Sequence, residues 1–155
     1  MKALVKTALV AALGFSALGA IAGEISDSTV DATGARNTAG SDRAQAYQYL
    51  GSTYGSGRIT NSRIYARGAR NDSFSRDGVA SQEIGIAGAG GRMDNVTVHA
   101  DRAFNRSAGS GAWAAQEIGK VTNGTMRNVT VFANDVVNNA DRDGSVAKQK
   151  IGVVN

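Results

Sequence analysis

Residue types that carry catalysis are sparse in this sequence. It contains one histidine, His99, and no cysteine. His99 stands at an outward position of an alternating segment, and Tyr65 and Phe132 fill the same position one repeat before and one repeat after it. We therefore expect a solvated surface residue. No Gly-x-Ser-x-Gly nucleophile motif occurs in a strand-turn-helix context. The sequence predicts no catalytic residues, and hence a protein that is not an enzyme.

Candidate metal and phosphate motifs are also weak. Asp141, Asp143 and Gly144 resemble part of a calcium loop, but the other repeats carry Asp-Gly or Ser-Gly there, and a nonapeptide calcium repeat is absent. The segment 88–91 resembles a phosphate loop only in its glycines, because it lacks the lysine and the following helix. We expect turns at both places, with no metal site and no cofactor.

Two columns of side-chain amides are the strongest chemical signal in the chain. Each recurs four times at a nearly constant spacing, and a fixed period of this length is the signature of a repeat architecture. The two sets are Gln48, Gln82, Gln116, Gln149 and Asn37, Asn71, Asn105, Asn138. Amides stacked at strand spacing donate to one neighbour and accept from the other, so each column is predicted to form an inward ladder. For the asparagines, turn formation stays open as an alternative.

The residues around these columns alternate with a period of two, which is typical of β-strands. Ala80, Gln82 and Ile84 share one face of a first predicted strand. In a second, Val96, Val98 and Ala100 share one face, and Asn95, Thr97 and His99 the other. The apolar columns predicted to face the core are Leu50, Ile84, Ile118, Ile151 and Val30, Ile64, Val98, Val131. Gly/Ser/Arg-rich stretches, including 88–92 and 106–111, are predicted turns. Two short strands and two turns per repeat predict an all-β solenoid of about four 34-residue coils.

The segment 1–22 is predicted to be a secretory signal peptide. Lys2 and Lys6 precede an apolar run from Ala8 to Ile21, which is shorter than the roughly 20 residues that span a bilayer, and a small-x-small site ends at Ala22. We expect residues 23–155 to be one secreted domain that does not insert into a membrane. Its predicted parts are an opening half-unit 23–45, units 46–79, 80–113 and 114–146, and a closing half-unit 147–155.

The two ends of the predicted domain are complementary. Residues 23–45 supply a second strand without a first, and residues 147–155 supply a first strand without a second. Joined across two molecules they complete a coil, and an uncapped strand edge is a template for pairing. We therefore predict head-to-tail stacking into a cross-β-like fibre. The predicted assembly ends are Gly23, Ile25, Val30 at one end and Gln149, Ile151, Asn155 at the other.

In these features the chain resembles the bacterial functional amyloids, and curlin most of all. Curlin subunits are exported, lack cysteine and consist of strand-turn-strand repeats with inward glutamine and asparagine ladders, which the two amide columns match. The curlin units are shorter, and their turn motif is not reproduced at fixed places. The resemblance implies an extracellular fibre at the cell surface, with a role in biofilm matrix or adhesion. It also implies self-association, an outer-membrane export apparatus and a nucleator as partners.

Other readings of the sequence remain open. Without Lys2 and Lys6 the formal charge falls from +4 to +2 and no block of like charge remains, so no nucleic-acid partner is expected. A monomeric surface adhesin or carbohydrate-binding solenoid is the main alternative, because outward aromatic residues could stack on sugars. These aromatic residues are Tyr47, Tyr49, Tyr54, Phe74, Trp113 and Phe132. An ice-binding face is disfavoured because Arg63 interrupts the only outward threonine column.

Overall fold

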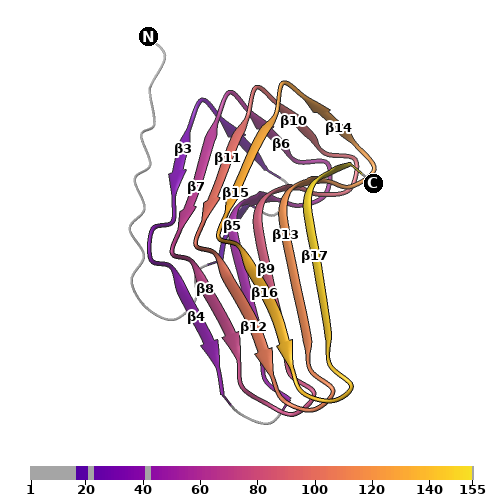
Figure 1. The fold of residues 1–155 in the computed structure, drawn as a ribbon. Helices are drawn as coiled ribbons and strands as arrows, with labels where there is room; N and C mark the ends of the chain where they lie inside the picture. The colour runs from indigo at the N-terminus through magenta and orange to yellow at the C-terminus, as the bar shows by residue number, and fades with distance from the viewer. Residues whose placement is uncertain (1–16, 21–22, 41–42, 155) are drawn as a thin grey trace.

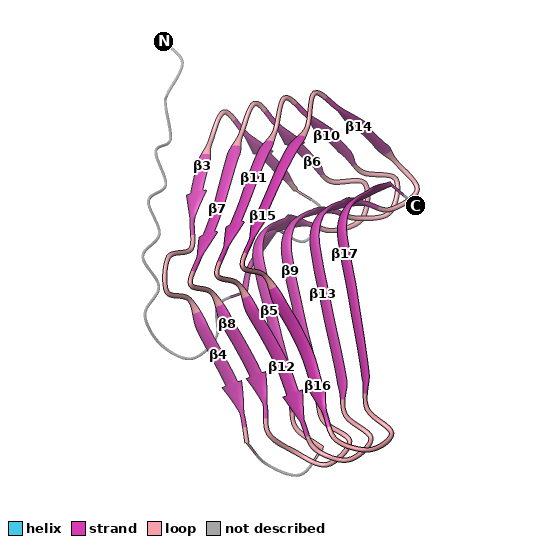
Figure 2. Cartoon of the chain, viewed as in Figure 1, coloured by secondary structure: helices cyan, strands magenta, loops and turns pink. Residues whose placement is uncertain are grey.

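The computed structural model describes residues 17–20, 23–40 and 43–154. Most of the predicted signal peptide, residues 1–16 and 21–22, lies outside the described residues, as does Asn155. Residues 17–20 form the strand β1 (Ala17–Ala20). The rest of the described chain winds through four coils, each of four strands (Figures 1 and 2).

The strands have the following bounds. Coil 1 contains β2 (Glu24–Ser26), β3 (Thr29–Asp31), β4 (Arg36–Ala39) and β5 (Gln45–Thr53). Coil 2 contains β6 (Arg58–Thr60), β7 (Arg63–Arg67), β8 (Arg70–Ser73) and β9 (Val79–Ala87). Coil 3 contains β10 (Arg92–Asp94), β11 (Thr97–Asp101), β12 (Phe104–Ala108) and β13 (Trp113–Val121). Coil 4 contains β14 (Thr125–Arg127), β15 (Thr130–Asn134), β16 (Val137–Asp141) and β17 (Val146–Val154).

Equivalent strands of successive coils pair in parallel and form four sheets. The orders are β1-β5-β9-β13-β17, β14-β10-β6-β2, β15-β11-β7-β3 and β16-β12-β8-β4. The register aligns repeat with repeat, so that Gln82 lies opposite Gln48 on one side and Gln116 on the other. Figure 1 shows the coils stacked side by side, with β17 as the last strand of its sheet. The predicted all-β solenoid of about four 34-residue coils is confirmed.

The coil differs from the prediction in the number of its strands, which is four rather than two. The predicted first strand is continuous, as in β9, but the predicted second strand is divided into three. Asn95 and Arg102 adopt φ values of 52° and 50° at the two breaks, and a residue in this left-handed region turns the chain out of a strand. Both predicted turns are also wrong in part, since Arg92 of the turn 88–92 belongs to β10 and residues 106–108 of the turn 106–111 belong to β12.

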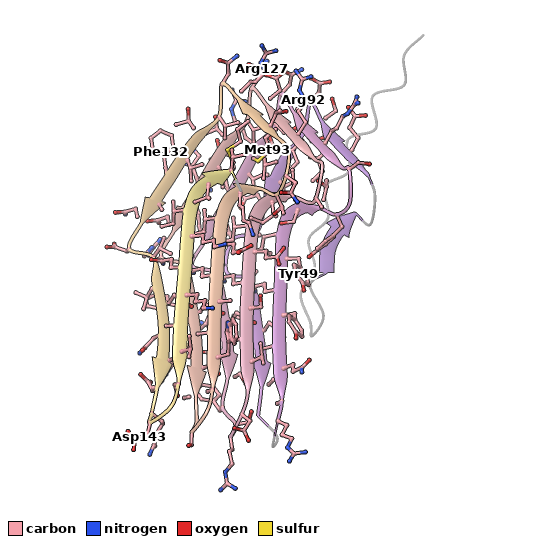
Figure 3. All side chains as sticks on the ribbon, turned by 90° about the vertical axis from the view of Figure 1, so that its right-hand side faces the viewer. Tyr49, Arg92, Met93, Arg127, Phe132 and Asp143 are labelled. Carbon is pink, nitrogen blue, oxygen red and sulfur yellow. The ribbon has the colours of Figure 1, made fainter. Side chains whose placement is uncertain are left out.

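The core lies between the sheets and consists of stacked identical or similar side chains. The column of Leu50, Ile84 and Ile118 is fully buried, as is the facing pair Ile64 and Val98. Met93 is fully buried, while Arg92 beside it points away from the body of the molecule (Figure 3). The interior is narrow, because adding a Cβ to Gly85 would bring it within 2.8 Å of Val98 Cγ2. Gly85 also has a φ of 62°, which glycine adopts at no steric cost.

Candidate assembly faces and amide ladders

The glutamine column forms a continuous hydrogen-bonded ladder in the first sheet. Each Nε2 donates to the Oε1 of the glutamine in the preceding coil. The distances are 2.6 Å from Gln82 to Gln48, 2.7 Å from Gln116 to Gln82, and 2.7 Å from Gln149 to Gln116. The first three glutamines of the column are fully buried. A buried amide without partners destabilises the fold by about 1–3 kcal/mol, and the ladder avoids this loss by pairing each glutamine with the equivalent glutamine of the neighbouring coil.

The asparagine column forms a second ladder, on the facing sheet. Nδ2 of Asn37, Asn71 and Asn105 donates to Oδ1 of the next asparagine at 3.0, 2.8 and 2.8 Å, ending at Asn138. These amides also reach across the coil to backbone carbonyls, for example from Asn71 to the carbonyl of Ser81 at 3.0 Å. The asparagines lie inside the strands β4, β8, β12 and β16. They are therefore ladder residues, and the turn-forming alternative does not describe them.

The two ladders run in opposite directions along the stack. Glutamines donate toward coil 1, whereas asparagines donate toward coil 4. At the coil 4 end, no glutamine of the described chain donates to Gln149 Oε1. Asn138 Nδ2 donates to the carbonyls of Lys148 at 2.7 Å and Ala114 at 3.2 Å, and to no further asparagine of the described chain. At the coil 1 end, Gln48 is fully buried and donates from Nε2 to the carbonyl of Arg70 at 3.4 Å. In the described chain, no further glutamine accepts from it and no asparagine donates to Asn37 Oδ1. Each donor at one end thus matches an acceptor at the other.

A third amide column, which the sequence analysis did not identify, lies at a corner of the coil. Nδ2 of Asn61 donates to Asp27 Oδ1 at 3.1 Å, Asn95 to Asn61 at 3.1 Å, and Asn128 to Asn95 at 3.0 Å. All four residues have φ between 46° and 52°, a region that Asn and Asp tolerate better than most residues. Their recurrence once per repeat was visible in the sequence. Alternation of the neighbouring residues placed Asn95 in a strand instead.

The side of coil 4 that faces away from coil 3, called here the coil 4 face, exposes residues that continue the buried columns of the core; the coil 1 face is the side of coil 1 away from coil 2. Ile151 is 40% exposed, whereas Ile118 directly behind it is fully buried. Gln149 and Val131, which continue the buried columns of coil 3, are exposed and half-buried respectively. At the coil 1 face, Gly23, Ile25 and Val30 are likewise only half-buried. The predicted assembly-end residues therefore lie at the two ends of the stack, apart from Asn155, which is not described.

One outward column stacks aromatic rings along the solenoid axis. Tyr65 and His99 are 4.9 Å apart between ring centroids, and His99 and Phe132 are 4.6 Å apart, with interplanar angles of 18° and 15°. Arg67 covers Tyr65, with its Cζ 4.5 Å from the ring centroid. Since the ring faces contact one another, His99 acts in packing on this surface. The stack presents mainly ring edges to solvent, with the exposed Phe132 at its end.

The outer face of the first sheet carries a mixed column of tyrosine, glutamate and lysine. The Tyr54 hydroxyl donates to Glu83 Oε2 at 3.3 Å, and Lys120 Nζ lies 2.8 Å from Glu117 Oε2. Loss of hydration on burial, and then the charge of Glu117, raise the pKa of Glu83. Burial, and then the charge of Glu83, also raise the pKa of Tyr54. Both shifts favour protonated groups, which suits a packed surface.

No chemical centre emerges within the described part of the chain. In residues 17–20, 23–40 and 43–154, His, Asp and Glu side chains form no group of three or more that could hold a metal ion. The same residues include no helix long and apolar enough to cross a membrane. The features that remain are the amide ladders and the two end faces. The chain matches no protein-family model, no curated protein and no solved structure.

Proposed function

We propose that this protein is a non-enzymatic structural subunit that is secreted and stacks head to tail into an extracellular fibre. One observation carries the proposal. The coil 4 face continues the buried columns of the interior in the register that joins the internal coils, yet the residues that end those columns are exposed or only half-buried. A second copy placed on this face would meet the same side chains that coil 4 meets on coil 3.

The ladder polarity supports a head-to-tail arrangement. Joining the coil 4 face of one copy to the coil 1 face of the next brings Gln48 Nε2 to Gln149 Oε1. It also brings Asn138 Nδ2 to Asn37 Oδ1. Two identical faces would oppose acceptor to acceptor in one column and donor to donor in the other, which leaves buried amides unsatisfied. A heterologous contact of this kind propagates into a filament when its rotation does not close a ring.

A fibre with a surface or matrix role follows from the predicted export and from the resemblance to curlin. An outer-membrane export apparatus and a nucleator are the partners that the same resemblance implies. The alternative of a monomeric carbohydrate-binding adhesin receives less support, because its candidate rings already have partners: Tyr47 stacks with Tyr49, and Phe132 with His99. Arg106 and Lys148 lie over the rings of Phe74 and Trp113. Sugar-binding platforms need accessible ring faces.

Electron microscopy and fibre diffraction test the proposal directly. With four coils per subunit and a strand spacing of about 4.8 Å, each copy should add a rise of about 19 Å. We expect unbranched filaments with a meridional reflection at about 4.8 Å from the secreted chain after incubation at neutral pH. A chain that stays monomeric at all concentrations up to about millimolar would contradict the fibre. Detection of the chain only inside cells that express it would contradict the predicted export.

A further inference from the structure

The edge of β5 that faces away from β9 already carries a parallel strand, and that strand comes from the predicted signal peptide. Backbone pairing places Ala17 opposite Tyr49 and Leu18 opposite Leu50, after which the register shifts. In backbone register, Leu18 is therefore paired with Leu50 as Ile151 is paired with Ile118. Among the described strands, β1 pairs only with β5, and every other pairing is between two strands of the set β2 through β17. The four coils are therefore complete without residues 17–20.

At the other end of the same sheet, β17 has a partner strand on only one side within the described chain. It pairs with β13 in the register Ala114 to Ala147, Gln116 to Gln149 and Ile118 to Ile151. Continuing this register onto β5 of a second copy brings Ala147 to Ala46, Gln149 to Gln48 and Ile151 to Leu50. Each inward residue thereby meets one of the same or a similar type.

The outward residues of these two strands are complementary as well. In the same register, Lys148 falls opposite Tyr47 and Lys150 opposite Tyr49. The two tyrosine rings lie parallel, with centroids 6.3 Å apart. A lysine within about 6 Å of such a ring centroid is attracted by it, and paired strands lie about 4.8 Å apart. Lys148 already makes such a contact within its own copy, with Nζ 4.6 Å from the Trp113 ring centroid.

We propose that the edge of β5 is the acceptor for β17 of a second copy, with Lys148 and Lys150 lying over Tyr47 and Tyr49, and that residues 17–20 occupy this edge until the second copy replaces them. The inference rests on the proposed function and assigns its junction. The lysines also prevent two coil 4 faces from meeting, since they would place like charges together. Removal of the predicted signal peptide would then expose the growing end.

Cysteine cross-linking tests the register of the junction. Because the sequence contains no native cysteine, only the introduced cysteines can form a disulfide. Gln45→Cys and Val146→Cys are made in separate chains of residues 23–155, which leaves both tyrosine-lysine pairs intact. Position 45 falls opposite 146 in the junction, because Val79 pairs with Gln45 and Trp113 pairs with both Val79 and Val146. Paired strands bring the two Cα atoms to about 5 Å, within the range that a disulfide spans. The matched control pairs Gln45→Cys with Val154→Cys, which also leaves both tyrosine-lysine pairs intact. Position 154 falls opposite Thr53, eight residues along the strand from position 45 and beyond the reach of a disulfide.

We expect oxidation of the mixture of Gln45→Cys and Val146→Cys chains to give disulfide-linked dimers. Neither variant alone nor the displaced control should form them. Filaments visible by electron microscopy without the 45–146 cross-link would overturn the junction and leave the fibre standing. Absence of both filaments and cross-link would overturn the proposed function together with the junction. The full chain with residues 1–22 is expected to cross-link at least tenfold more slowly. Equal rates would overturn the role of residues 17–20.

A charge variant tests the lysines themselves. Lys148→Gln with Lys150→Gln removes two cation–π contacts and should raise the critical concentration for assembly about 5- to 30-fold. The matched control is Arg63→Gln with Arg76→Gln, which removes the same charge from exposed positions of coil 2. Equal effects of the two double variants would overturn the assignment of the lysines to the junction. Circular dichroism of each variant establishes that its coils are folded.

Discussion

Replacing Gln82 by leucine tests whether the glutamine ladder holds the coils together. Gln82 is fully buried, donates to Gln48 Oε1 at 2.6 Å and accepts from Gln116 Nε2 at 2.7 Å. Leucine fills a similar volume but neither donates nor accepts. The substitution therefore leaves one acceptor on Gln48 and one donor on Gln116 without their ladder partners, inside the core.

The cost follows from these two groups. Each buried polar group that loses its partner destabilises the fold by about 1–3 kcal/mol, which gives about 2–6 kcal/mol for both. Gln116 Nε2 keeps a contact of 3.3 Å with the carbonyl of Ala103, and leucine adds buried apolar surface. We therefore expect a loss in the lower half of the range, about 2–4 kcal/mol. For a chain of this size that loss corresponds to a Tm lower by about 4–16 °C.

The assay is urea unfolding of the monomeric full chain, followed by far-ultraviolet circular dichroism, with the free energy of unfolding taken from the midpoint and slope. Ser81→Leu is the matched control, because Ser81 is adjacent on the same strand, faces outward and receives the same new side chain. Its effect should stay within about 0.5 kcal/mol. If Gln82→Leu and Ser81→Leu change the free energy of unfolding equally, the ladder is not what stabilises the stack.

Three further substitutions test other parts of the coil. Gly85→Ala should lower the free energy of unfolding by about 2–4 kcal/mol, because position 85 combines a φ of 62° with overlap of the new Cβ onto Val98. The control Gly90→Ala has a φ of 75° and open space around it, and should cost about 1 kcal/mol. Equal costs for the two variants would rule out the close approach of Gly85 to Val98. Asn95→Ala should lower the Tm more than Asn95→Gly. Both variants lose the hydrogen bonds to Asn61 and Asn128, but only glycine adopts the φ of 52° without strain. A larger loss for Asn95→Gly would assign the stabilisation to the amide ladder rather than to the backbone conformation. Glu83→Gln should raise the Tm at pH 7 but not at pH 4: a carboxyl whose pKa is raised by folding contributes its stability at low pH and loses it as the pH rises through the folded pKa. Tm differences that are the same at both pH values would show that the charge of Glu83 is not destabilising.

Much of the coil could be predicted because strand periodicity acts locally. The alternation of Ala80, Gln82 and Ile84 indicates one inward face whatever surrounds the strand, and the same residues one repeat away must stack on it. The breaks at Asn95 and Arg102 were missed, because the strand prediction rested on the alternation of Val96, Val98 and Ala100. Across each break the buried residues are three positions apart rather than two, from Met93 to Val96 and from Ala100 to Ala103. A positive φ at arginine is uncommon, but the equivalent residues Gly34 and Gly68 adopt it as well, so the turn is shared by the column rather than indicated by Arg102 itself.

The direction of the ladders is a second feature that depends on the tertiary structure. Gln82 and Asn71 carry the same chemical group, yet the glutamines donate toward coil 1 and the asparagines toward coil 4. The difference depends on the backbone carbonyls that each amide also reaches, such as that of Ser81 for Asn71. Those carbonyls belong to other strands that face the amide across the coil, such as β9 for Asn71, so their positions are set by the closed coil.

The sequence by itself determined the repeat length, the strand type and the inward columns, because the alternation along a strand and the recurrence from coil to coil are properties of residue order. Only the tertiary structure decided that the coil has four strands, that the two ladders have opposite polarity, and that β1 covers the edge of β5. Each of these depends on which groups meet across the coil or between coils. Such contacts are made by hydrogen bonds and packing over distances in sequence that local patterns do not encode.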